Sequence, residues 1–218
     1  MRKLLLLFLL LSQMYALHAE FINIGIFQSE KISAFEFSIR AGKYAIFTET
    51  GKVKELNAES KLEVSFSDGK LILKENGKLI GSYTKINLMG IGWYNHFMIR
   101  SKSPDGLERR YDDNLKITAF RTQMQLVNNI NLDNYVAGVV EAEVGRKPPK
   151  AYFKLQAIIC RTYALSNTSR HFAEGFNLCD EVHCQAYHGK TFYADIVEAS
   201  MQTRGAVIVD SDIQLITA

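Results

Sequence analysis

The sequence predicts an α+β fold, in which an antiparallel, β-rich N-terminal half is followed by a helical region with a closing strand. Short stretches of alternating apolar and polar residues, separated by turn dipeptides, run from Phe21 to about Leu126. Helical spacing of apolar residues begins after Asn128. The 218 residues include 47% hydrophobic and 22% charged side chains, which is enough apolar chain for a well-buried core and excludes a disordered protein.

The first half is expected to form short strands joined by tight turns, because Asp-Gly and Asn-Gly supply the positive φ that hairpins need. The turn signals are Thr50-Gly51, Asp68-Gly69, Asn76-Gly77 and Asp105-Gly106. The stretches that we assign to strands are Asn23 to Phe27, Lys43 to Thr48, Leu62 to Phe66, Lys70 to Lys74, Leu79 to Thr84, Phe97 to Ser101 and Leu115 to Phe120. This half contains no catalytic motif, and Trp93-Tyr94 beside His96 is its one candidate for a carbohydrate contact.

The second half is expected to begin with two helices, Leu132 to Val144 and Ala151 to Ser166, separated by Gly145 and Pro148-Pro149. A loop rich in His and Cys follows, then a helix at Tyr193 to Thr203 and a strand that begins at Ala206. We therefore expect residues 1–19 to be a signal peptide, residues 20–127 a β-rich region and residues 128–218 the catalytic core.

The first nineteen residues carry Arg2 and Lys3 ahead of an apolar run, and end in small residues at Ala16 and Ala19. This pattern is typical of a secretory signal peptide and predicts export to the periplasm, cell envelope or exterior. The run from Leu4 to Leu11 is too short to cross a bilayer, which needs about 20 residues, so no transmembrane segment is expected in the mature chain.

Charge gives no support for a nucleic-acid partner. Residues 1–19 hold two of the 26 basic residues and none of the 23 acidic ones, so the rest of the chain has 24 basic and 23 acidic residues and a net charge of +1. Nucleic-acid binding depends largely on neutralising phosphates, and a near-neutral chain without a basic run does not predict it.

The chain has three cysteines, an odd number for an exported protein. Cys160 falls in a helical apolar stretch and is expected to be a small buried side chain. Cys179 and Cys184 lie together in the polar loop.

Glu143 is the leading candidate for a catalytic residue. On a helical wheel that starts at Leu132, Glu143 falls at about 20°, on the side of Val136 and Val139, while Glu141 falls at about 180°. Two alternatives are open for Glu143. It is partly buried, which would favour the protonated form that a general acid needs, or it lies at the frayed end of the helix in solvent.

The second helix places Gln156 and Arg161 at the edges of its apolar face. Arg161 either pairs with a carboxylate or covers apolar surface with its stem while its head stays in solvent, and the pattern alone favours the second alternative.

Three ordered motifs resemble the SpoIID/LytB family of stage II sporulation protein D and amidase-enhancer proteins. They are Leu132-Asp133-x-Tyr135-Val136-x-Gly138-Val139-Val140-x-x-Glu143, Lys154-x-Gln156-Ala157-x-x-x-Arg161-Thr162-Tyr163-Ala164 and Cys179-Asp180-x-x-His183-Cys184-Gln185-x-Tyr187-x-Gly189. The resemblance implies a peptidoglycan lytic transglycosylase that cuts peptide-free (denuded) glycan strands and forms 1,6-anhydro-N-acetylmuramic acid. It matches the family's catalytic acid to Glu143, and it implies that Gln156, Arg161, Tyr163, Gln185 and Tyr187 bind substrate or support the site.

The resemblance also implies that the loop can bind zinc, as it does in some family members, although no cofactor is expected to be required. The candidate ligands are His171, Cys179, His183 and Cys184, whose thiolates and imidazoles suit Zn²⁺. A disulfide between Cys179 and Cys184 is the competing expectation in an oxidising compartment.

Two departures from the family bear on the functional prediction. Val144-Gly145 stands where the family usually has Met-Pro, and the chain ends at Ala218, before the Ser/Gly-rich segment that completes the family's groove. Either the core is truncated or this segment is dispensable. The alternative to an enzyme is a non-catalytic amidase enhancer that binds the cell wall or a wall amidase.

Overall fold

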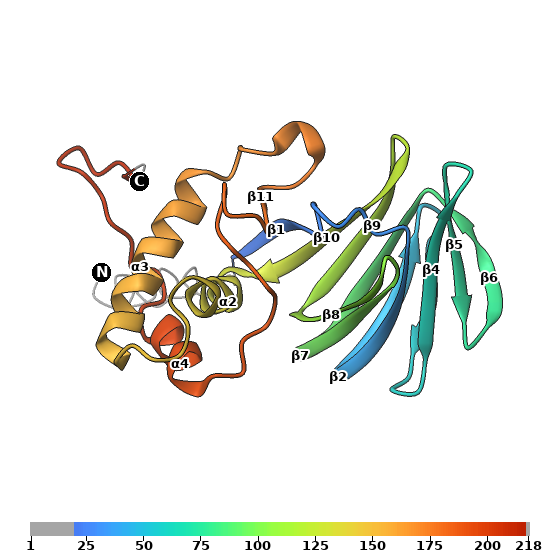
Figure 1. Ribbon diagram of the computed structural model, residues 1–218, viewed down its shortest axis with the longest axis horizontal. Coiled ribbons are helices and arrows are strands. Elements are labelled where there is room, and N and C mark those ends of the chain that lie inside the picture. The colour runs from blue at the N-terminus through green and yellow to red at the C-terminus, as the bar shows by residue number, and fades with distance from the viewer. Residues whose placement is uncertain (1–19, 217–218) are drawn as a thin grey trace, which may run out of the picture.

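The computed structural model describes residues 20–216, so the signal peptide predicted at residues 1–19 lies outside the described residues. A long, curved sheet extends to one side of a group of helices (Figure 1). The strand order is β11-β1-β10-β9-β7-β2-β4-β5-β6, with β3 paired to β2 and β8 paired to β7. Only the short β11 pairs in parallel, with β1, and every other pairing among the described residues is antiparallel. The predicted α+β class is confirmed.

The strands are β1 (Phe21–Ile26), β2 (Ala34–Thr48), β3 (Gly51–Leu56), β4 (Lys61–Ser67), β5 (Lys70–Glu75), β6 (Lys78–Tyr83), β7 (Lys85–Ser103), β8 (Asp105–Asp112), β9 (Asn114–Phe120), β10 (Gln123–Asn131) and β11 (Leu178–Cys179). The helices are α2 (Leu132–Val144), α3 (Lys150–Ser166) and α4 (Ala194–Gln202), with a short 3-10 turn, η2 (Phe172–Glu174).

Two predicted hairpin turns are confirmed. Asp68 and Gly69 join β4 to β5, and Asn76 and Gly77 join β5 to β6. All four residues have positive φ, which is the backbone of the type I′ turn that matches the twist of two antiparallel strands.

The long central strands β2 and β7 were predicted only in part, as Lys43 to Thr48 and Phe97 to Ser101. Bulges interrupt their pairing, because Ala41 is opposite His96 while Lys43 is already opposite Ile91. The irregular segment breaks the apolar alternation, and the sequence therefore hides the continuity of both strands. Strands β3, β8 and β10 were missed altogether.

The helical half follows the sheet without a linker. β10 lies between β1 and β9 and is buried along most of its length, and α2 begins at the next residue. α2, α3 and α4 pack against one another, and one continuous hydrophobic core runs from β1 to α4. The core therefore fixes α2 relative to the sheet.

The closing strand predicted from Ala206 is wrong. Residues 206–216 stay outside the sheet and form a single antiparallel bridge between Val209 and Leu215. The segment is instead held to α3, where Thr162 Oγ1 accepts a hydrogen bond from the Ile208 N–H at 2.9 Å.

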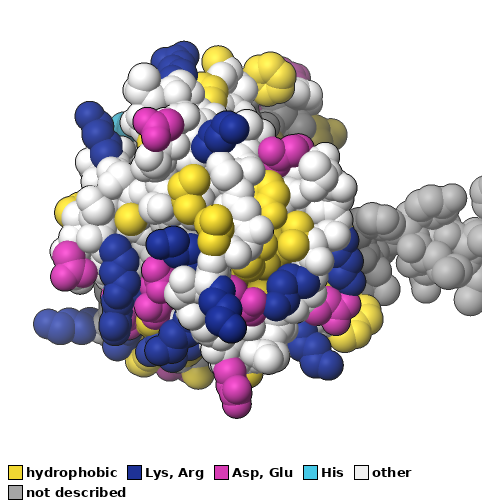
Figure 2. Space-filling model, turned by 90° about the vertical axis from the view of Figure 1, so that its right-hand side faces the viewer, with side chains coloured by type: hydrophobic (Ala, Val, Ile, Leu, Met, Phe, Trp, Pro, Cys, Tyr) yellow, Lys and Arg dark blue, Asp and Glu magenta, His cyan; other side chains and the backbone are white. Residues whose placement is uncertain are grey.

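The surface at the β6 end of the sheet carries basic and acidic side chains intermingled around a group of apolar ones (Figure 2). Leu79 on β6 is 66% exposed and is one of the large apolar side chains at this end. Among residues 20–216, no helix combines the length and the apolar character needed to span a bilayer.

Candidate functional site

The helix that carries Glu143 is capped at both ends. The Asn131 side chain at the end of β10 accepts hydrogen bonds from the backbone N–H groups of Asp133 and Asn134, at 2.9 and 3.4 Å. Gly145, with φ of 69°, ends the helix and donates its N–H to the Glu141 carbonyl. Eight of the first nine residues of α2 are buried, whereas its last turn extends past the core. Glu143 lies in that last turn.

The environment of the two carboxylates is the reverse of the helical-wheel expectation. Glu143 is exposed, as in the second alternative for this residue. Glu141 is half-buried and pairs with Arg146 at 2.5 Å. The wheel was misleading because the 188–190 loop covers the Glu141 side of the helix end and forms with it a polar cleft of about 350 Å³.

One hydrogen bond holds the Glu143 carboxylate. Gln156 on α3 donates from Nε2 to Glu143 Oε2 at 3.3 Å, and the same nitrogen lies 3.6 Å from the sulfur of Cys160. Cys160 is buried, as predicted, and burial together with the nearby Glu143 raises the pKa of its thiol to about 12. Gln156 thus fixes one carboxylate oxygen and leaves the other available to a ligand.

Gln185 and Tyr187 form a buried floor beneath this region. Tyr135 on α2 donates to Gln185 Oε1 at 3.3 Å, its ring lies 5.0 Å from the ring of Tyr187, and Tyr187 donates to Asn128 Oδ1 at 3.1 Å. Burial raises the pKa of both tyrosines well above the usual value, so they stay neutral hydrogen-bond donors. Gln185 and Tyr187 lie under α2, and among the described residues no hydrogen bond joins either of them to Glu143.

Arg161 lies away from Glu143 and is buried, so the expectation of a solvated head is wrong. It is 1% exposed and donates to Asp133 Oδ1 on α2 and to the carbonyls of Ser200 and Thr203 at the end of α4, at 2.9, 3.0 and 2.8 Å. The guanidinium therefore ties the three helices together.

Four potential metal ligands meet in the loop after α3. The side-chain donor atoms of His171, Cys179, His183 and Cys184 all lie within 4.8 Å of one another. Cys179 Sγ is 3.5 Å from His183 Nδ1, and Cys184 Sγ is 3.3 Å from His171 Nε2. Two thiols and two imidazoles at this separation fit a tetrahedral Zn²⁺ site.

The two thiols of this His/Cys cluster differ in pKa. The hydrogen bond from Cys179, with help from the His171 imidazole, lowers the pKa of the Cys184 thiol to about 5. The same pairing and burial raise the pKa of Cys179. Glu174 Oε2 lies 2.7 Å from His171 Nδ1, which is the position of a carboxylate that orients a metal-binding imidazole. Sequence reasoning missed Glu174, although its spacing of three residues from His171 was a usable signal.

Two further contacts fix the cluster in the fold. β11 brings Cys179 beside Gly25 of β1. Asp180, the next residue, accepts hydrogen bonds from the Phe27 N–H at 2.7 Å and from Arg109 Nη1 at 3.0 Å. Burial raises the pKa of Asp180 to about 6, and the Phe27 N–H and Arg109 oppose that rise. The Asp180 contacts were not predicted, although the residue stands within the Cys-containing motif.

Tyr163 joins α3 to the same loop. Its hydroxyl donates to the His183 carbonyl at 3.3 Å and accepts from Arg170 at 3.0 Å. Of the predicted supporting residues, Gln156 contacts Glu143, Tyr163 supports the His/Cys cluster, Gln185 and Tyr187 lie in the floor, and Arg161 joins the helices.

Comparison with known proteins agrees with this arrangement. Residues 120–209 match the family described as SpoIID, stage II sporulation protein. The match begins at the end of β9 and covers all of α2, α3, the His/Cys cluster and α4. No curated protein matches the chain. The family indicates a role related to the cell wall.

Proposed function

We propose that this chain, whose residues 120–209 are a SpoIID domain, is a lytic transglycosylase that cleaves peptide-free glycan strands of peptidoglycan. The observation that carries the proposal is the state of Glu143: it is exposed at a capped helix end, and one of its carboxylate oxygens is held by Gln156. An exposed acid can reach a polymeric substrate, while the hydrogen bond limits the directions in which its other oxygen points.

The reaction needs only one carboxylate. Glu143 protonates the oxygen that links C1 of N-acetylmuramic acid to the next sugar, and the C1–O bond breaks as that sugar leaves as an alcohol. The 6-hydroxyl of the same muramic acid then attacks C1, and its proton returns to the Glu143 carboxylate. No water is consumed, and the product is the 1,6-anhydro sugar. Hydrolytic glycosidases generally need a second, opposed carboxylate for the attacking group.

Glu141 is unsuited to that second role. Its carboxylate is paired with Arg146 and faces the polar cleft on the other side of α2 from Glu143. The separation of the two acids across the helix is therefore consistent with single-carboxylate chemistry.

We also propose that zinc, when bound by His171, Cys179, His183 and Cys184, has a structural role. Four protein ligands complete a tetrahedral site and leave no position for substrate. The metal would fasten the loop that carries Gln185 and Tyr187 beneath α2. Glu143 would act without direct help from it, in agreement with the expectation that no cofactor is required.

Export is part of the same proposal, because peptidoglycan lies outside the cytoplasmic membrane. It depends on the signal peptide predicted in residues 1–19, which is tested by sequencing the N-terminus of the mature protein.

Product analysis tests the proposed function. The full chain is incubated with glycan strands from which an amidase has removed the stem peptides, and the ends formed are identified by mass spectrometry. We expect 1,6-anhydro ends, which are one water lighter than the reducing ends made by hydrolysis. Hydrolytic ends would contradict the proposal. Binding without cleavage, combined with stimulation of a wall amidase, would instead support the amidase-enhancer function.

A further inference from the structure

An ordered bulge in β7 displays two aromatic residues. Between Ile91 and His96, which pair with Lys43 and Ala41 of β2, residues 92–95 have no partner on β2. The buried Asn95 fixes the bulge, since its side chain accepts the Lys43 N–H at 3.0 Å and donates to the Gly92 carbonyl at 3.2 Å. Bulges of this kind re-aim side chains and are common beside functional sites.

The bulge exposes large apolar surface that the fold does not use. Trp93 is fully exposed and Tyr94 is 59% exposed. Phe192, from the segment before α4, is 55% exposed, and the rings of Tyr94 and Phe192 lie 5.4 and 6.0 Å from the ring of His96. Two distant segments of the chain therefore place aromatic faces around one histidine.

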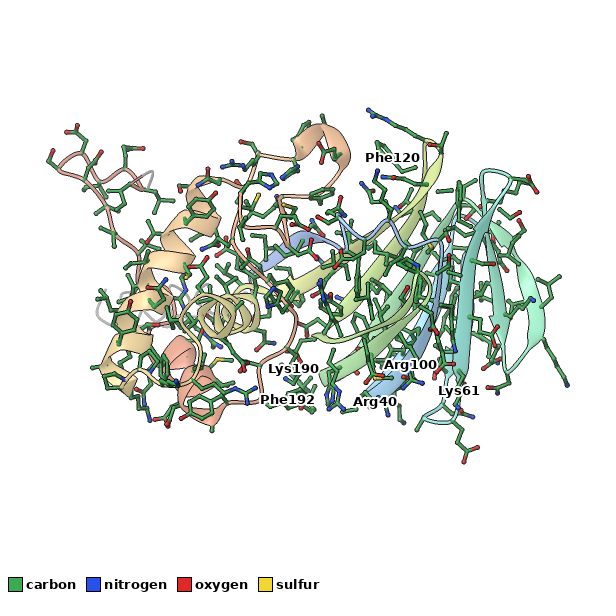
Figure 3. All side chains as sticks on the ribbon, viewed as in Figure 1. Arg40, Lys61, Arg100, Phe120, Lys190 and Phe192 are labelled. Atoms are coloured by element: carbon green, nitrogen blue, oxygen red, sulfur yellow. The ribbon has the colours of Figure 1, made fainter. Side chains whose placement is uncertain are left out.

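Basic groups accompany these rings. Lys190 Nζ lies 5.5 Å from the ring centre of Tyr94 and 5.4 Å from that of Phe192, and the guanidinium of Arg110 lies 5.5 Å over Phe192. Figure 3 shows Lys190 and Phe192 together, with Arg40 nearby, where β7 and β2 face the helical half. Lys190 also contacts Asp112 at 2.8 Å, whereas no ion pair is recorded for Arg110 among the described residues.

His96 is the buried residue among these aromatic and basic side chains. It is 8% exposed, and its Nδ1 is one of the buried polar side-chain atoms, within residues 20–216, that have no hydrogen-bond partner. A buried polar atom without a partner is uncommon in a folded protein and is often a sign of a functional site. The aromatic contacts of Tyr94 and Phe192, and not a hydrogen bond from Nδ1, hold this ring.

We propose that Trp93, Tyr94, His96, Arg110, Lys190 and Phe192, the basic aromatic patch, bind an anionic amino-sugar strand at a second site, apart from Glu143. Exposed aromatic faces stack on the apolar faces of sugar rings, and the cations match the lactyl carboxylate that each muramic acid carries once its peptide is removed. The choice of this glycan rests on the proposed function, while the existence of the site rests on the patch itself.

The position of the patch suits a long polymer. Lys190 belongs both to the patch and to the polar cleft lined by Gly138, Glu141, Arg146 and His188. The patch therefore continues into this cleft, which reaches Glu141 in the last turn of α2. Glu141 is two residues before Glu143 in the sequence. A strand held at the patch would be kept near the catalytic helix between successive cleavages.

A glycan fits this surface better than a nucleic acid. Bases also stack on aromatic rings, but such binding is accompanied by an extended basic groove along the phosphates. Here the basic groups are confined to the patch, and Asp112 partly neutralises them. Single-stranded DNA is nevertheless the necessary competitor in the test.

Trp93 is the single tryptophan of the chain and precedes Tyr94 in the exposed bulge, so its fluorescence reports on the bulge. Peptide-free glycan strands are titrated into the Glu143→Gln protein, which is not expected to cut them. We expect a saturable change in emission, and roughly tenfold weaker binding in Tyr94→Ala with Phe192→Ala, because each stacked ring contributes about a threefold factor. Lys190→Gln should weaken binding of these strands but not of neutral N-acetylglucosamine oligomers.

Phe120→Ala and Arg100→Gln are the matched controls. Phe120 also has an arginine over its ring, Arg121 at 5.0 Å, but it lies at the end of β9, at the top of Figure 3 and away from Lys190 and Phe192. Arg100 is an exposed arginine outside the patch. Both controls should bind like the parent. Affinity of each variant is also measured by co-sedimentation with insoluble glycan, so that the result does not depend on the Trp93 signal.

Three results would overturn the inference: no binding of glycan by either fluorescence or co-sedimentation, equal loss in patch and control variants, or tighter binding of single-stranded DNA than of glycan. Failure of the proposed function would look different. In that case the wild type would leave glycan uncut, while binding would still depend on Tyr94 and Phe192.

Discussion

The guanidinium of Arg161 and the carboxylate of Asp133 form a buried ion pair, with 2.9 Å between Nη2 and Oδ1, that joins α3 to α2. Asp133 is also approached by Arg204 from the end of α4, at 2.6 Å. The pair holds together the three helices on which Glu143 depends for its position.

Truncation of Arg161 should therefore destabilise the protein strongly. Arg161→Ala leaves Asp133 with Arg204 as its remaining partner and removes the guanidinium from the carbonyls of Ser200, Thr203 and Ala206. We expect a loss of roughly 3 kcal/mol in the free energy of unfolding. Arg204→Ala removes a pair whose arginine side chain is 61% exposed and should cost less than about 1 kcal/mol. Urea unfolding measures the free energy of unfolding of both variants. Similar losses in the two would contradict the larger contribution that we assign to the buried pair between Arg161 and Asp133.

The sequence predicts most accurately those elements whose signals are local. Leu132 to Val144 was predicted as a helix with the bounds that it has, from the spacing of its apolar residues and from Gly145 after its end. The two turns at Asp68-Gly69 and Asn76-Gly77 were likewise predictable from residues that favour positive φ.

The remaining features depend on contacts between distant segments. β8 contains Glu108, Arg109 and Arg110 and has no apolar alternation, so the sequence did not predict it as a strand. Its position is determined by pairing with β7 and by the contact between Arg109 and Asp180. The motifs located Glu143 and Arg161, but helical periodicity left the exposure of Glu143 open and gave the wrong environment for Arg161. Helical periodicity contains no information about how far α2 extends past the core, or about the pairing of Arg161 with Asp133.

Gly138 should tolerate no side chain, because α2 packs closely on the loop beneath it. A Cβ at this position would lie 2.5 Å from the Gly189 carbonyl oxygen and 2.6 Å from the ring of Tyr187. Gly138→Ala is expected to lower the free energy of unfolding by about 2 kcal/mol through overpacking. Gly77→Ala is the control, since its Cβ would meet open space and the cost of its positive φ is about 1 kcal/mol. A smaller loss at Gly138 than at Gly77 would contradict the close packing.

The His/Cys cluster should bind one zinc ion per chain. Cys179→Ser, Cys184→Ser, His171→Ala and His183→Ala should each lower the metal content, whereas Cys160→Ser should retain it. Glu174→Gln should weaken zinc affinity by about 10- to 100-fold, because the carboxylate orients His171. Elemental analysis of protein purified without chelator measures the metal. If no zinc is found and thiol titration of the unfolded protein detects only Cys160, a Cys179–Cys184 disulfide replaces the zinc proposal.

His96 should make stability depend on pH. Burial, followed by the charges of Lys190, Arg110 and Arg40, lowers its pKa below the usual 6.5. The folded state then binds fewer protons than the unfolded state, so this contribution to the free energy of unfolding is fully present above the unfolded pKa of about 6.5 and is lost as the pH falls from there through the lower pKa of the folded state. His96→Gln should remove this dependence, and Lys190→Gln should raise the pKa of His96 in an NMR titration. An unchanged pKa in Lys190→Gln would contradict the assigned cause.

The assignment of catalysis to Glu143 is tested most directly by the yield of 1,6-anhydro ends from peptide-free glycan strands, measured by mass spectrometry for Glu143→Gln and Glu141→Gln. Both changes keep the shape of the side chain and remove a carboxylate from the same helix. We predict that Glu143→Gln abolishes these ends with no change in fold, because the transferable proton is lost, and that Glu141→Gln retains nearly full yield. Full activity of Glu143→Gln, or equal losses in the two variants, would contradict the account.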